Sequence, residues 1–356
     1  MTLLLSEADV EAAFDMREAI DSLEQAFGAL ADGEAVNRPR SHTYTDRGDG
    51  RHHLFKTKDG AVAPLGVHAL RLSSDLVTTE RTRSITRRVK LPAAPGGRYV
   101  GLVLLFDLDS LAPTAIMPDG YLQRMRVGAT SALAARHLAR RESSTAAVIG
   151  VGWQAGAQVR GLDTDRSLHR IMVHGPTPAR VEAFVSEHAG MVDAKLMAVG
   201  SAREAIEGAD IVALSTNSME PVLDGAWLTP GQHVGSVQGY ELDQTTLRRA
   251  DVIAVRSLDP STYHHAPGRA PAEVAAEPEI DEVVRARMVE LGDIVAGRAG
   301  RTDDAQITLF TGSHSGAGSG LGIQFAAVGH AVETNARSLG LGRDLPTEWF
   351  TQSGRP

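Results

Sequence analysis

The stretch TAAVIGVGWQAGAQVRGL, which begins at Thr145, constrains the fold more than any other part of the chain. A short apolar run leads into Gly150 and Gly152, and residues typical of a helix follow. In a strand–turn–helix of this kind, the first glycine allows the tight turn and the second lets a pyrophosphate approach the backbone. The small third residue, Ala155, lets the helix lie close to the strand. The pattern predicts a dinucleotide whose phosphates meet the N-terminus of the helix.

Apolar runs and helical segments alternate from Thr145 onward. Six short runs, from AAVIGVG to DVIAVRS, are separated by segments such as ARVEAFVSEHAG. This alternation predicts an α/β fold with a Rossmann-type, doubly wound parallel sheet. The earlier part predicts a helix over 6–33 and strands near 66–76 and 98–110. We expect 258–279 to be an exposed loop, and the amphipathic segment 321–340 to be a helix that packs back on the first part.

Composition excludes several classes of function. The 356 residues carry a formal net charge of −8 and no cysteine. This argues against nucleic acid as a main partner and excludes disulfides, thiolate metal sites and a cysteine nucleophile. The histidines lack metal-ligand spacing, so we expect no metal. The N-terminus lacks a basic leader and the longest apolar run is short, which predicts a cytoplasmic protein with no membrane span.

The residues after the second strand of the sheet bear on the choice of coenzyme. An NAD site usually offers an acid there to the ribose hydroxyls, but this chain has His174, Gly175 and Pro176. Thr177 and Arg180 follow, and a hydroxyl with a guanidinium can hold a 2′-phosphate. The sequence therefore favours NADP(H) over NAD(H). Alternatively, Thr177 only caps the next helix.

Several long segments together resemble the ornithine cyclodeaminase/mu-crystallin family. They are GLVLLFDLDSLAPTAIMPDGYLQRMRVGATSALAARHLARR, AAVIGVGWQAGAQV, STNSMEPVLDGAWLTPGQHVGSVQG and GDIVAGRAGR. The resemblance covers about residues 35–340. It implies a homodimer with an α+β substrate-binding and dimerisation domain, formed by 1–128 plus 318–356. A Rossmann dinucleotide-binding domain, 129–317, is inserted between these parts.

The resemblance also implies which residues hold an amino-acid or imine substrate. Family members grip the substrate carboxylate with arginine and lysine, which Arg126 and Arg40 match. A family lysine on the strand after the first loop is interpreted as replaced by Arg71. Lys56 is a further candidate cation, and Phe325 stands where the family has an aspartate, which suggests an apolar wall. A solvated surface position is the alternative for each arginine.

Further residues are expected at the coenzyme. Ser215, Thr216 and Asn217 end a strand at the carboxyl edge, where ligands of doubly wound sheets bind. Thr130 is interpreted as helping to hold the pyrophosphate, although its hydroxyl could instead bond to its own helix. The remaining expected coenzyme contacts are Trp153, Gln154, Val237 and Gln238.

These features predict an NADP(H)-dependent oxidoreductase that transfers hydride to or from C2 of a 2-imino or 2-amino acid. Arg71, Arg126 and Tyr240 are the expected catalytic residues. The proton source stays open among Tyr240, His68, Asp119, Glu241 and water. One alternative is a cyclodeaminase, but the loop SVQGYELD carries Gln238 where that chemistry uses an aspartate. A binding protein of the crystallin kind, without turnover, is the other alternative.

Overall fold

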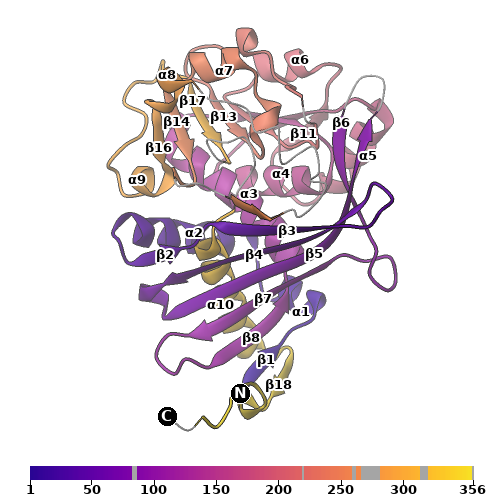
Figure 1. The fold of residues 1–356 in the computed structure, drawn as a ribbon. Helices are drawn as coiled ribbons and strands as arrows, with labels where there is room; N and C mark the ends of the chain where they lie inside the picture. The colour runs from indigo at the N-terminus through magenta and orange to yellow at the C-terminus, as the bar shows by residue number, and fades with distance from the viewer. Residues whose placement is uncertain (82–85, 219, 259–261, 266–280, 313–319, 355–356) are drawn as a thin grey trace.

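The computed structural model describes residues 1–81, 86–218, 220–258, 262–265, 281–312 and 320–354. The described strands form two sheets, and helix α3 (Gly120–Leu138) lies between them (Figure 1). One sheet contains eight strands and the other ten. The boundary expected at 128/129 falls inside α3, and the division into two domains stays a prediction. No helix in the described ranges is long and apolar enough to cross a membrane.

The eight-stranded sheet confirms the Rossmann-type prediction. Its order is β11-β10-β9-β12-β13-β17-β14-β16, and all pairs are parallel. The order reverses between β9 and β12, and ligands of such sheets bind outside the carboxyl ends of the strands at this point. The strands are β9 (Thr145–Ile149), β10 (Arg170–His174), β11 (Lys195–Ala198), β12 (Ile211–Leu214), β13 (His233–Ser236), β14 (Val252–Val255), β16 (Met288–Glu290) and β17 (Thr308–Thr311).

Both faces of this sheet are buried, as parallel sheets require. Ala146 and Val148 of β9 face one apolar cluster, with residues of α4 and α5, while Ala147 and Ile149 face another, with residues of α6 and α7. This alternation explains why the strands read as continuous apolar runs. The helices are α4 (Trp153–Asp165), α5 (Pro178–His188), α6 (Ala202–Glu207), α7 (Gln244–Arg249), α8 (Glu282–Arg285) and α9 (Leu291–Val295).

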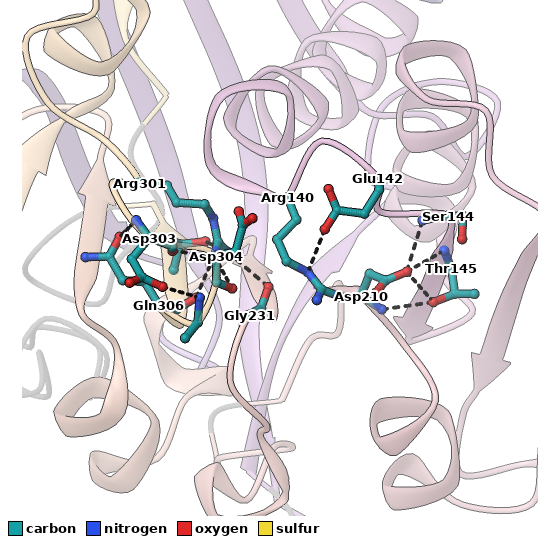
Figure 2. Close-up of polar contacts among 12 residues, drawn as sticks. Arg140, Glu142, Ser144, Thr145, Asp210, Gly231, Arg301, Asp303, Asp304 and Gln306 are labelled. Carbon is teal, nitrogen blue, oxygen red and sulfur yellow. Dashed lines mark hydrogen bonds and ion pairs between the residues drawn. The ribbon is translucent and has the colours of Figure 1, made fainter.

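A polar network joins the amino ends of these strands. Asp210 accepts hydrogen bonds from the backbone and hydroxyl of Thr145 and pairs with Arg140 at 2.5 Å (Figure 2). Arg301 donates to the carbonyl oxygens of Gly231 and Gln306, which precede β13 and β17. These bonds tie the amino ends of the strands together, so this edge is structural and leaves the carboxyl edge for ligands.

The ten-stranded sheet is mostly antiparallel, with the main order β15-β3-β4-β5-β7-β8-β1-β18. The exposed loop predicted over 258–279 is wrong at β15, which pairs parallel with β3 and places Thr262 opposite Arg40. Residues 266–279 of that loop lie outside the described ranges. The strands are β1 (Thr2–Leu4), β2 (Ala35–Asn37), β3 (Arg40–Asp46), β4 (His52–Val62), β5 (Val67–Arg81), β6 (Thr86–Leu91), β7 (Val100–Asp107), β8 (Pro113–Pro118), β15 (Thr262–His265) and β18 (Arg343–Leu345).

Helices cover one face of this sheet. The segment predicted as one helix over 6–33 forms two, α1 (Glu7–Ala12) and α2 (Met16–Ala31), because Asp15 caps a new helix start. The predicted C-terminal helix is confirmed as α10 (Gly322–Leu339), which packs on β4, β5 and α2. A Cβ on Gly322 would lie 2.0 Å from the carbonyl oxygen of Asp59, so only glycine allows this close approach.

Candidate functional site

The glycine turn predicted to hold a pyrophosphate follows β9 at the point where the strand order reverses. Gly150 has φ +121°, and a Cβ there would lie 2.2 Å from the carbonyl oxygen of Ser215. Gly152 is exposed and is the N-cap of α4, with open space where its Cβ would be and no side-chain cap. Ala155 is fully buried. The start of this helix is therefore open at Gly152, as the approach of an anion requires.

The two glycines have different roles: Gly150 permits the backbone conformation, and Gly152 leaves room for a phosphate. One variant of each tests these roles. Gly150→Ala is expected to lower the melting temperature by several degrees, because alanine is strained at φ +121° and clashes with the backbone. Gly152→Ala is expected to keep the melting temperature and raise the coenzyme Kd by about tenfold, which is roughly 1.4 kcal/mol. Thermal melts and fluorescence titration measure both. Unchanged coenzyme affinity in Gly152→Ala would contradict the phosphate position.

The strands beside the turn end in polar groups at the same edge. The Ser215 hydroxyl and Gln154 Oε1 are buried and lack a hydrogen-bond partner among the described residues. Thr216 donates its backbone N–H and hydroxyl to Glu241, and the Gln238 amide donates to the Thr216 carbonyl oxygen at 2.6 Å. Unsatisfied buried polar atoms beside the turn are compatible with a bound dinucleotide.

Glu241 organises this loop. The carboxylate is fully buried and also accepts hydrogen bonds from the Ser236 hydroxyl and the Gln238 backbone. Burial raises the pKa of Glu241, against the opposing effect of these hydrogen bonds. Its two oxygens are thus engaged in holding the loop, in the 3-10 turn η3 (Gly239–Glu241) that also carries the half-buried Tyr240.

Of the other expected coenzyme contacts at this end, Asn217 is exposed and the Val237 N–H bonds to Leu214. Trp153 is half exposed, with the Arg124 guanidinium 5.4 Å from its ring centre.

The expected adenosine-side residues gather at the end of β10. Nδ1 of His174 lies 3.3 Å from the Val199 carbonyl oxygen. Thr177 is the N-cap of α5, with Pro178 in its first turn, but the hydroxyl makes no capping hydrogen bond. Thr177 and Arg180 are both exposed. Thr177 therefore occupies the N-cap position of α5 without making a capping hydrogen bond through its hydroxyl.

The Thr130 hydroxyl bonds to its own helix, which is the alternative to holding the pyrophosphate. The side chain is fully buried, donates to the Arg126 carbonyl oxygen at 2.6 Å and accepts from the Gln324 amide at 2.6 Å. A buried hydroxyl that is bonded on both sides is not free for a pyrophosphate. Instead it connects α3 with α10.

Three buried cations surround one aromatic ring at the face of the ten-stranded sheet. Lys58 Nζ, the Arg71 guanidinium and the Arg126 guanidinium lie 5.4, 5.6 and 5.2 Å from the centre of the Phe325 ring. Lys58 and Arg71 are directly opposite each other on β4 and β5. The ring fixes the cations but supplies no negative charge to neutralise them.

The partners of these cations are mostly neutral. Arg126 bonds to the amide oxygens of Gln123 and Gln324, at 3.0 and 3.3 Å. Lys58 donates to the Gly320 carbonyl oxygen at 3.1 Å. Arg71 alone pairs with a carboxylate, that of Asp119, through a 2.7 Å hydrogen bond from Nε. In the described ranges, no carboxylate pairs with Lys58 or Arg126.

Burial and mutual repulsion lower the pKa values of Lys58 and Arg126. Desolvation, and then the charges of Arg71 and Arg126, hold the pKa of Lys58 well below its usual value. Desolvation and Arg256 likewise lower the pKa of Arg126. An anion that entered this cluster would relieve both effects.

The structure separates Lys56 from the cluster. Lys56 lies on the same face of β4 as Lys58, but its Nζ pairs with Asp75 at 2.6 Å. Burial alone would raise the pKa of Asp75, but Lys56 and Lys90 together lower it to about 2. Arg40 begins β3 and is half-buried, close enough for its charge to act on Lys58.

Sequence reasoning missed Lys58 and Arg256. In HLFKTKDG, Lys56 and Lys58 share one face of a strand, and the alternation could have named both. The interpretation that Arg71 replaces a family lysine on its strand stays a prediction, but the cluster contains a lysine, Lys58, opposite Arg71. Arg256 directly follows β14 and so lies at the carboxyl edge, a signal available in DVIAVRS.

Helix α3 connects the cluster with the glycine turn. It carries Arg126, and two residues later Gly128 lies so close to α4 that a Cβ would be 2.3 Å from the Ala157 carbonyl oxygen. Helix α3 also packs against β13 and β17. The cluster and the dinucleotide turn are therefore joined through one rigid helix. In the part of the chain that the structure describes, no group of acidic or histidine side chains could hold a metal ion.

An α/β sheet with a glycine turn beside a buried cationic cluster defines a dinucleotide-binding fold with a site for a small anionic ligand. The model of the ornithine cyclodeaminase/mu-crystallin family matches residues 1–338, and the chain belongs to that family.

Relatives in this family differ in their chemistry. A putative dehydrogenase of Rhizobium meliloti is 31% identical over 86% of this chain and 89% of its own. An alanine dehydrogenase of Archaeoglobus fulgidus is 25% identical over 97% and 98%. The solved Δ1-pyrroline-2-carboxylate reductase of Thermococcus litoralis, in complex with NADH and L-proline, is 28% identical, covers 97% and 100%, and has a TM-score of 0.77. An ornithine cyclodeaminase of Agrobacterium fabrum is 30% identical over 58% and 57%.

Proposed function

We propose that the protein is an NADP(H)-dependent oxidoreductase that transfers hydride to or from C2 of a 2-imino or 2-amino acid. The observation that carries this proposal is the convergence of Lys58, Arg71 and Arg126 on the Phe325 ring, with one carboxylate among them. Buried cations without counter-ions are costly, and a carboxylate ligand offsets that cost.

The guanidiniums are suited to hold the substrate carboxylate. Arg126 reaches neutral amide oxygens in the free protein, and it can exchange these for the two oxygens of a carboxylate. Asp119 holds Arg71 in place through Nε. Substrate fixed in this way has its C2 at the junction of the cluster and the carboxyl edge, and Phe325 keeps water from one side.

Lys58 is suited to supply the proton. When bound, the coenzyme supplies a hydride from C4 of its dihydronicotinamide ring to C2, and the electron pair of the C=N bond then needs a proton at nitrogen. Lys58 is an ammonium whose pKa is lowered by burial and by Arg71 and Arg126. Such a group releases a proton more readily than an ordinary lysine, while arginine effectively cannot.

The preference for NADP(H) rests on the end of β10. His174, Gly175 and Pro176 replace the acid that would repel a 2′-phosphate. The exposed Thr177 hydroxyl makes no capping bond, and Arg180 follows on the same exposed turn. Together they offer a hydrogen bond and a positive charge to a phosphate.

A reductase is favoured over a cyclodeaminase by the loop after β13. Gln238 has no basic oxygen to activate water, and its amide is bonded to the Thr216 carbonyl. A pure binding protein would leave the proton source, Lys58, without a use.

The test combines coenzyme titration with turnover. We expect fluorescence titration to give a lower Kd for NADPH than for NADH. Absorbance at 340 nm should then fall when a 2-oxo acid is added with ammonia or methylamine, or when a cyclic 2-imino acid is added. Binding without oxidation across this panel would sink the oxidoreductase proposal. Equal or tighter binding of NADH would sink the coenzyme preference alone.

We also propose a homodimer formed through the open face of the ten-stranded sheet. Opposite the face covered by helices, neighbouring strands pair Leu70 with Leu104 and Leu72 with Leu102, and all four side chains are only half-buried. An apolar sheet face of this kind is suited to a second copy. Light scattering should give twice the 37.8 kDa chain mass, and a monomer at micromolar concentration would contradict it.

A further inference from the structure

Arg256 is a fourth buried cation, and the proposed reaction does not use it. It follows β14 at the carboxyl edge and is 2% exposed. Its Nη1 donates to the Gly312 carbonyl oxygen at 3.2 Å, and its guanidinium lies 5.2 Å from the centre of the Phe310 ring. The buried Nε has no partner, and no carboxylate of the described residues pairs with Arg256.

Arg301, which joins the amino ends of the strands, has a different hydrogen-bonding pattern from Arg256. It donates to five carbonyl oxygens along the amino edge and to the Thr308 hydroxyl. The Nε atoms of Arg140 and Arg166 are also buried without a partner, but both side chains bond to carboxylate or carbonyl oxygens through their other nitrogens. Arg256 bonds to one carbonyl oxygen of the described residues and to no carboxylate. A buried guanidinium held so sparsely is costly, which points to a ligand.

Arg256 lies near the cations that surround Phe325. The Phe310 ring below it belongs to the same core cluster as the Phe325 ring below Arg126. Arg40 lies beside the chain that follows Arg256, because β3 pairs with β15. Arg256 acts on the pKa of Arg126, while Lys58 is affected by Arg71, Arg126 and Arg40. Arg256 therefore adds a further positive charge near Arg126.

A single carboxylate cannot bind Lys58, Arg126 and Arg256 together, because its two oxygens span little more than one guanidinium. We propose that the substrate carries a second acidic group and that Arg256 binds it, so that the preferred substrates are dicarboxylic 2-imino or 2-amino acids. This inference rests on the proposed function, whose site it extends. Arg256 is then a specificity-determining residue.

The test compares substrates of equal length. With NADPH and ammonia, we expect kcat/KM for 2-oxoglutarate to exceed that for 2-oxopentanoate by about 10²-fold, the effect of one buried charge pair. Arg256→Met should lower kcat/KM about 10²-fold for the dicarboxylate and less than about threefold for the monocarboxylate. Arg256→Lys, which retains a charge, should recover part of the preference. The exposed Arg248→Met is the matched control and should behave as wild type.

A binding measurement separates the two proposals. Calorimetry with glutarate and with pentanoate, which cannot react, should detect glutarate alone, and Arg256→Met should abolish that binding. Glutarate binding without turnover of any imine would overturn the proposed reaction and keep the acidic-ligand site. Turnover of both substrates with equal kcat/KM, or equal losses in Arg256→Met, would overturn the role of Arg256 and keep the reaction. If Arg256→Met does not fold, the wild-type preference and the glutarate titration decide.

Discussion

Arg126→Met is expected to lower kcat/KM for an imino acid by about 10³-fold, because removing one partner of a buried, hydrogen-bonded charge pair costs roughly 2–5 kcal/mol. The coenzyme Kd should stay within about twofold of the wild-type value, since the glycine turn is untouched. The melting temperature of the free protein should not fall. Without ligand, Arg126 is buried against neutral amides, and desolvation lowers its pKa, so its charge opposes folding.

Arg136→Met is the matched control on the same helix. Arg136 lies ten residues further along α3 and pairs with Glu24 and Asp165, both at 2.7 Å. We expect it to lower the melting temperature and leave kcat/KM unchanged. Activity losses of similar size in the two variants would show that α3 geometry, and not the Arg126 charge, governs catalysis.

Lys58→Met is expected to reduce kcat for imine reduction by about 10²–10⁴-fold, the usual contribution of a positioned acid. The pH dependence gives a sharper test. Reduction uses the protonated lysine, so the wild-type kcat should fall as the pH rises through the pKa of Lys58. Because burial and neighbouring guanidiniums lower that pKa, the fall should come below the ordinary lysine value of 10.5.

In the reverse direction, the oxidation of an amino acid needs neutral Lys58, so its rate should rise over the same pH range. Lys58→Arg keeps the charge but cannot release a proton. It should therefore lose most of the activity, together with the pH dependence of both reduction and oxidation. Lys56→Met, at the neighbouring position that pairs with Asp75, should change kcat by less than about tenfold. If kcat for reduction by Lys58→Arg falls with rising pH as it does in the wild type, Lys58 is not the proton source.

The strands and the glycine turn were predictable because their signals are local. A buried parallel strand reads as an apolar run, and Gly150 and Gly152 are needed by backbone geometry within a few residues. The same holds for α10, whose apolar face is periodic in the sequence. The break between α1 and α2 was missed, because a capping aspartate such as Asp15 resembles any surface acid until the chain turns there.

The cationic cluster was only partly predictable because it is assembled from distant segments. Which of Lys56 and Lys58 meets a counter-ion depends on Asp75, on the neighbouring strand. Thr130 was expected at the coenzyme, but its hydroxyl accepts a hydrogen bond from Gln324, nearly two hundred positions away. Strand β15 lies in a segment rich in proline and polar residues, and its pairing with β3 has no local signal.

The close approach of Gly322 in α10 to Asp59 in β4 has a consequence for synthesis of the chain. Strand β4 leaves the ribosome some 260 residues before α10, which must lie on it to bring Phe325 over Lys58. At 5–20 residues per second, that interval is on the order of 10–50 s. During this time α10 does not yet cover the cation-bearing face of the nascent sheet, while the strands around the glycine turn are synthesised within the interval. The last helix to be translated therefore completes the substrate side of the site.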